Sequence, residues 1–251
     1  MTASRIAHLK TIVGTLVAIA LVAFAAWAYV DGETSPAGHP PAEGSPQQEW
    51  TQPMSAEEQG RALRSLAELR VADKDDRGDY DRTGQFGRAW VDTAEDVALA
   101  GNGCDTRNDI LQRDLTDITF TSDGKDCVVA TGTLWDPYTG KTINFERGPA
   151  SGAVQIEHIV ALKDVWLSGG RELSERDRIR VANDPINLIA ADGPTNGSKG
   201  NKDASQWMPP YEPIHCFYVA SQIRVKEKYN LTVTPSEKAF METTLQGCPT
   251  V

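Results

Sequence analysis

The stretch Val154-Gln155-Ile156-Glu157-His158-Ile159-Val160 places an acidic residue and a histidine at the end of an apolar run. Residues 154–156 predict a short strand, and a helix is predicted from about Val160. Adjacent side chains of an extended strand point to opposite faces, so Glu157 and His158 can serve one site only where the chain bends or bulges. A strand that leads through such a pair into a helix predicts a mixed α+β domain.

The flanking sequence extends this prediction in both directions. A capping box at Ser55-Ala56-Glu57-Glu58 begins a helix whose leucines recur at helical spacing. The β-branched run Cys127–Leu134 and the run Lys141–Glu146 are separated by Asp136-Pro137-Tyr138-Thr139-Gly140, which predicts a β-hairpin. Further helices are predicted to begin at Thr93, Glu175, Pro213 and Pro235. The predicted fold is therefore α+β and helix-rich, with a hairpin and a few short strands.

The N-terminal sequence predicts that the protein is exported from the cytoplasm. Three basic or titratable residues, Arg5, His8 and Lys10, precede an uncharged run from Thr11 to Val30, and about 20 helical residues reach the roughly 30 Å thickness of a bilayer core. We interpret residues 1–30 as a signal anchor or signal peptide, with the anchor favoured because the run is long. Residues 31–53 predict a disordered Pro/Gly/Ala-rich tether, and residues 54–251 the folded domain. The domain is predicted to lie outside the cell, membrane-bound, or secreted if the segment is cleaved.

The four cysteines agree with an oxidising compartment. Cys216 lies near the start of one predicted helix and Cys248 just after another. If these helices fold back on each other, the two cysteines meet, which leaves Cys104 to pair with Cys127. Free or metal-binding thiols are the alternative, and the absence of any CxxC spacing argues against it.

The charge distribution bears on the partner. A formal net charge of −10 argues mildly against a nucleic-acid partner, because phosphate binding usually leaves a basic footprint. Residues 141–202, however, hold 9 Lys/Arg and 8 Asp/Glu, a net of +1. This local balance permits a site for an anionic substrate.

Two later stretches share the polar character of the acid–histidine pair: Asn183-Asp184-Pro185-Ile186-Asn187-Leu188 and Asn196-Gly197-Ser198-Lys199-Gly200-Asn201-Lys202. Taken alone they are solvated turns by default. Their order after Glu157-His158 resembles an HNH endonuclease family, in its secreted actinobacterial branch related to the C-terminal nuclease domain of GmrSD restriction enzymes. The resemblance spans residue 107 to the C-terminus.

The resemblance implies an embedded ββα-metal motif. In it His158 is the general base, Glu157 a metal ligand, and Asn187 the residue that holds the loop and the imidazole in place. Asn196 stands where many such proteins have a second histidine ligand. Because amide and carboxylate oxygens suit hard cations, one divalent ion, Mg²⁺ or Mn²⁺ rather than Zn²⁺, is expected.

Two basic residues complete the predicted site. Arg147 and Lys199 are each expected to contact a phosphate oxygen. For both, a surface salt bridge is the alternative.

The sequence thus predicts an extracytoplasmic, metal-dependent nuclease that hydrolyses phosphodiester bonds, with DNA favoured over RNA and little base specificity. The alternatives are a catalytically inactive membrane-tethered binding domain of the same fold, or a hydrolase of another phosphoester. GxSxG, HExxH and phosphate-loop motifs do not occur, which removes serine-hydrolase, zincin and P-loop classes. No protein partner is inferred.

Overall fold

The computed structural model describes residues 50–122 and 126–251. The predicted membrane or signal segment at 1–30 and the tether up to residue 49 lie outside these residues. Within the described ranges, no helix combines the length and apolar character needed to cross a bilayer. Trp50, which the sequence places in the tether, is only 6% exposed and lies with its ring 5.9 Å from that of Phe217. The folded part therefore already includes Trp50.

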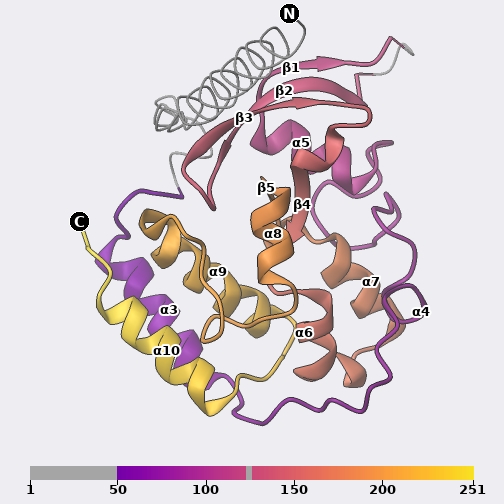
Figure 1. Ribbon diagram of the computed structural model, residues 1–251. Coiled ribbons are helices and arrows are strands. Elements are labelled where there is room, and N and C mark those ends of the chain that lie inside the picture. The colour runs from indigo at the N-terminus through magenta and orange to yellow at the C-terminus, as the bar shows by residue number, and fades with distance from the viewer. Residues whose placement is uncertain (1–49, 123–125) are drawn as a thin grey trace, which may run out of the picture. The chain divides into compact units, whose positions relative to one another are not determined.

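The described chain is a mixture of helices and short strands (Figure 1), as the sequence predicts. The helices are α3 (Ala56–Glu68), α4 (Arg82–Phe86), α5 (Thr106–Asp114), α6 (Leu162–Leu167), α7 (Glu175–Asn183), α8 (Gly193–Lys199), α9 (His215–Lys228) and α10 (Pro235–Gln246). The strands are β1 (Thr116–Phe120), β2 (Val129–Asp136), β3 (Lys141–Glu146), β4 (Val154–His158) and β5 (Leu188–Asp192).

The strands form two antiparallel sheets. One has the order β1-β2-β3, and its β2–β3 pair is the predicted hairpin. The other pairs β4 with β5, so that Val154 faces Asp192 and His158 faces Leu188. Because α8 follows β5 directly and contacts both strands, β4, β5 and α8 form a ββα unit in the middle of the described part of the chain (Figure 1).

Most of the helices begin at or near the residues where the sequence predicts them. Ser55 and Thr234 each form a complete capping box, with Glu58 and Glu237 respectively. The helix predicted from Thr93 is wrong, because residues 92–102 form turns and bends. Asp96 and Leu99 have φ angles of +60° and +70° there, which a right-handed helix cannot contain.

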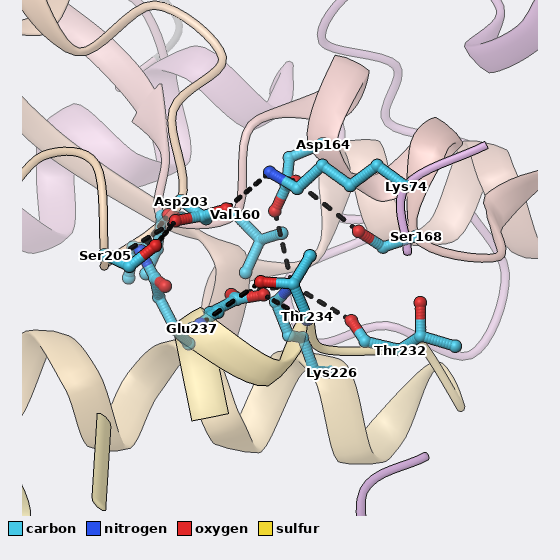
Figure 2. A network of polar contacts seen from close by, with 12 residues as sticks. Lys74, Val160, Asp164, Ser168, Asp203, Ser205, Lys226, Thr232, Thr234 and Glu237 are labelled. Carbon is cyan, nitrogen blue, oxygen red and sulfur yellow. Dashed lines mark hydrogen bonds and ion pairs between the residues drawn. The ribbon is translucent and has the colours of Figure 1, made fainter. Parts of the chain in front are cut away.

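A buried ionic network joins α6, α9 and α10 (Figure 2). Lys226 of α9, fully buried, lies 3.3 Å from Asp164 of α6 and 2.9 Å from Glu237 of α10. Lys74 lies 2.7 Å from both Asp164 and Asp203. Since buried charges are tolerated only when paired, this network fixes α6, and with it the chain that leaves β4, against α9 and α10.

Both predicted disulfides are present. Cys104 pairs with Cys127, and Cys216 pairs with Cys248. Together they account for all four cysteines of the chain. The second bridge ties the start of α9 to the residue that follows α10, as the helical hairpin predicts.

Candidate active site

The ββα unit is shaped by local signals around α8. Asp192, the last residue of β5, accepts a hydrogen bond from the backbone N–H of Thr195 at 2.8 Å and so caps the helix. Pro194 stands in the first turn, where its missing N–H costs nothing. Gly200, with a φ of +59°, ends the helix. These signals are sufficient for a short helix although Gly197 lies within it.

His158 ends β4 and is only 8% exposed. Its Nε2 lies 2.9 Å from the carbonyl oxygen of Ala182. A carbonyl can only accept, so Nε2 carries the proton and donates it. The other ring nitrogen, Nδ1, has no hydrogen-bond partner among the described residues and is the nitrogen left to accept a proton.

The acceptor for His158 is available because α7 ends beside it. The last carbonyls of a helix have no partner within the helix, and Pro185 prevents the helix from continuing beyond Asn183. Ala182 therefore offers its oxygen to the imidazole. The carbonyl of Val181, one residue earlier, accepts from the amide Nδ2 of Asn187 at 3.2 Å.

Asn187 is completely buried and connects three pieces of chain. Its Oδ1 accepts from the backbone N–H of Val160 at 2.8 Å, and its Nδ2 also donates to the carbonyl of Val160 at 3.3 Å. The residue thereby holds the exit of β4 against the end of α7, where the acceptor of His158 lies. The catalytic importance of this loop-holding position of Asn187 stays a prediction.

The wall facing the imidazole comes from a segment that precedes the predicted motif. The indole of Trp90 is stacked on the imidazole, with centroids 5.5 Å apart and planes 11° apart. The guanidinium of Arg82 lies 5.9 Å from the Trp90 ring centroid. Burial lowers the pKa of His158 from 6.5 to about 3, with smaller contributions in the same direction from Arg82 and Lys199, against the Ala182 hydrogen bond, which raises it. At neutral pH the imidazole is therefore the free base.

Glu157 is directed away from this wall. Its carboxylate is paired with the ammonium of Lys199 of α8, a residue with no exposed surface. The same ammonium donates to the backbone carbonyl of His158 at 2.7 Å. Burial raises the pKa of Glu157, and Lys199 opposes that rise. Lys199 thus forms a buried ion pair, where the sequence left a surface salt bridge as the alternative.

Asn196 lies on the same side of the strand as Glu157. Its amide Nδ2 donates to Oε1 of Gln155 at 2.8 Å, and Gln155 and Glu157, two residues apart, share one face of β4. The structure therefore pairs Lys199 with Glu157 and Asn196 with Gln155 on one face of β4, whereas the alternation of the strand puts the His158 side chain on the other face.

The residues predicted to hold a metal ion are engaged by protein groups in this arrangement. In residues 50–122 and 126–251, no group of three or more His, Cys, Asp or Glu side chains is placed to hold one. The carboxylate that the sequence assigns to the ion is neutralised by Lys199. His158 and Asn196 are likewise hydrogen-bonded to protein groups, Ala182 and Gln155 respectively, so each of the three predicted residues has a protein partner in this geometry.

Arg147 follows β3, and its guanidinium binds protein acceptors. Its Nε donates to the carbonyl of Val129 at 2.7 Å, and one terminal nitrogen donates to Oδ1 of Asn108 at 2.7 Å. The structure does not bring Arg147 into contact with the other predicted site residues.

Comparison with known proteins identifies the family. The family described as GmrSD restriction endonucleases, C-terminal domain, matches residues 105–243. The chain belongs to this family. An uncharacterized secreted protein of Arthroderma benhamiae is 35% identical over 154 residues, which cover 61% of this chain and 71% of the relative. No solved structure matches the chain.

Three groups that surround His158 were not found by sequence reasoning. Arg82 and Trp90 lie before the matched region in a stretch without helical or strand periodicity. The carbonyl of Ala182 belongs to a residue type that carries no chemical signal. The available sequence signal is the composition of residues 82–90, which contain two arginines and no acidic residue.

Proposed function

We propose that this chain is an HNH-type nuclease that hydrolyses phosphodiester bonds with His158 as the general base. The supporting observation is the hydrogen bond from Nε2 of His158 to Ala182, within a β4-β5-α8 unit and inside the region that matches the restriction endonuclease domain. This bond fixes the tautomer that a proton-accepting histidine needs.

In the proposed reaction, Nδ1 of His158 takes a proton from a water molecule that attacks phosphorus. The ring is unprotonated at neutral pH, and because an efficient general base has a pKa near the working pH, the proposal requires that the negative charge of the bound substrate raise this pKa. The imidazolium that forms is stabilised by the Ala182 carbonyl and by the C-terminal end of α7, where the helix dipole favours positive charge. Asn187 keeps that helix end in place through Val181 and Val160.

A divalent cation, Mg²⁺ or Mn²⁺, remains our prediction for this reaction, with Glu157 and Asn196 as its oxygen ligands. Such an ion would stabilise negative charge on the phosphate oxygens. Because Lys199 holds the Glu157 carboxylate, we assign no step to the ion. Arg147 and Lys199 likewise stay predictions as phosphate contacts.

The place of action is proposed to be outside the cell, with DNA favoured as substrate. The A. benhamiae relative is described as secreted, and the two disulfides suit an oxidising compartment. Whether residues 1–30 anchor the protein in a membrane or are removed is part of this proposal and not of the described structure.

The test is hydrolysis of supercoiled plasmid and of an RNA transcript by the full chain with disulfides intact. Reactions contain Mg²⁺, Mn²⁺ or a chelator. His158→Ala should abolish cleavage, whereas the matched variant His215→Ala should retain it, because His215 donates to Pro209 on another part of the chain. If wild type and His158→Ala are equally inert with every metal, the inactive binding domain is the better description.

A further inference from the structure

A small surface depression next to the Ala182 acceptor of His158 carries two arginines in a chain with an acidic net charge. It is lined by residues between positions 82 and 90, among them Arg82, Arg88 and Trp90, and by Leu162, Ala182 and Asn183. Two lining residues are arginines and none is an acid, although the chain as a whole has a net charge of −10. The carbonyl of one lining residue, Ala182, is the acceptor for His158, so the depression lies next to the proposed base.

The two arginines have no acidic partner in the described residues. Neither Arg82 nor Arg88 belongs to any ion pair found there, whereas Arg113, Arg171, Arg176 and Arg180 each contact a carboxylate. The Arg82 guanidinium makes no hydrogen bond within the described residues, and it lies 5.9 Å from the centroid of the Trp90 ring. Its N–H groups are thus available to an external acceptor, and guanidinium groups suit phosphate oxygens.

The wall that carries Arg82 and Trp90 is held in a fixed position next to the imidazole. The backbone N–H of Val91 donates to Oδ1 of Asn183 at 3.0 Å, and the carbonyl of Val91 accepts from Thr106 at 3.0 Å. Asn183 is the last residue of α7, one residue beyond Ala182. The helix end that orients His158 therefore also positions Trp90, which stacks on the imidazole.

We infer that Arg82 and Arg88, with Trp90, bind the phosphate backbone of a nucleic acid beside His158. This inference rests on the proposed function and deepens it, because it names residues that would hold the substrate. These residues lie outside the matched region 105–243, so the segment before the GmrSD C-terminal domain completes its site.

The strongest effect is expected from removal of both charges. Binding of a labelled single-stranded DNA oligonucleotide is measured in the His158→Ala background, where no cleavage occurs. Arg82→Gln/Arg88→Gln should raise the Kd at least about tenfold, since a charge-assisted hydrogen bond is worth more than a neutral one. The dependence of log K on log salt should flatten by about 0.7 for each phosphate that the variant no longer neutralises.

The matched control is Arg64→Gln/Arg224→Gln, which removes the same charge from exposed positions on α3 and α9. It should change the Kd less than about twofold, as expected of a screened long-range effect. The single variant Arg88→Gln separates loss of binding from misfolding, because Arg88 is exposed and its substitution should leave the fold intact. It should raise the Kd for DNA by part of the factor seen for the double variant. Arg82→Lys, which keeps the charge but not the forked donor geometry, should bind more tightly than Arg82→Gln.

The outcomes separate this inference from the proposed function. If wild type cleaves DNA but the two double variants bind alike, the inference fails and the nuclease function stands. If wild type and His158→Ala are equally inert but only the Arg82/Arg88 double variant loses binding, the inference holds and the function fails. If the His158→Ala protein binds no DNA at low salt, the phosphate-binding wall is refuted.

Discussion

The imidazole of His158 lies nearly parallel to the indole of Trp90, with 5.5 Å between ring centroids. This stacking removes one face of the imidazole from water, and the Ala182 carbonyl occupies its Nε2. What remains for chemistry is the Nδ1 edge of a ring whose orientation and tautomer are both fixed.

The burial of His158 predicts a specific loss of stability in acid. Its pKa in the folded state, about 3, lies below the ordinary value of 6.5, so the unfolded chain binds the proton first. Its contribution is complete above pH 6.5 and is lost as the pH falls toward 3, at about 1.4 kcal/mol for each pH unit. Urea unfolding from about pH 7.5 to about pH 4.5 should therefore show a steeper decline for wild type than for His158→Gln. Parallel curves would mean that the folded protein can protonate this ring.

Asn187→Asp should strongly reduce nuclease activity although the two side chains have almost the same size. The aspartate keeps an acceptor for the Val160 N–H but loses the donor to the carbonyls of Val160 and Val181. We expect about 100-fold slower cleavage from the displaced helix end, with a loss of about 1–3 kcal/mol in unfolding free energy. Asn144→Asp, at an exposed position of β3, is the control. Full activity in Asn187→Asp would remove Asn187 from the site.

Lys199→Met tests whether Glu157 can hold a cation. The variant leaves a buried carboxylate without its ammonium partner, and we expect it to be less stable than wild type by about 3–5 kcal/mol. If Glu157 is a metal ligand, Mn²⁺ at about 100 times its Kd should restore about 2.7 kcal/mol of stability to the variant. Thermal unfolding with and without Mn²⁺ measures this gain, and Lys202→Met, at an exposed residue, should show none. A variant indifferent to Mn²⁺ and Mg²⁺ would argue that Glu157 serves only as the partner of Lys199.

Lys226→Met should be among the most destabilising single changes. It leaves Asp164 with Lys74 as its remaining partner and leaves Glu237 buried without a cation. A loss of about 3–5 kcal/mol is expected in urea unfolding, against less than about 0.5 kcal/mol for Lys141→Met on the surface. The double variant Lys226→Met/Glu237→Leu should be more stable than Lys226→Met, because it removes the orphaned carboxylate. An additive double variant would show that the two side chains are not coupled.

The features predicted from sequence are those encoded within a few residues. The capping boxes at Ser55 and Thr234 and the β2–β3 hairpin each depend on neighbours in the chain, and all three are present. Strand β5 was not predicted, because Leu188–Asp192 has no alternation and becomes a strand only by pairing with β4. The helix predicted from Thr93 is the opposite case. A local capping signal predicted a helix there, but the segment forms turns and bends.

In the candidate site, too, some features could be predicted from the sequence and others could not. The residue types at 157, 158, 187 and 196 were found through their order in the chain. Their orientation was not, because it depends on contacts between distant segments. The pairing of Glu157 with Lys199 joins positions 42 residues apart, and the Trp90 ring reaches His158 from outside the recognisable motif. No local pattern contains either relationship.

The disulfides have a practical consequence for anyone who shortens the chain. The family match runs from residue 105 to residue 243, so it stops one residue short of Cys104 and five short of Cys248. A fragment cut at those limits would keep Cys127 and Cys216 as unpaired thiols, ready to cross-link one copy to another. It would also lack the whole of α3 and the Arg82-to-Trp90 segment. Inactivity or aggregation of such a fragment would reflect the choice of its ends. An activity assay on a shortened protein should therefore keep residues 50–251 together.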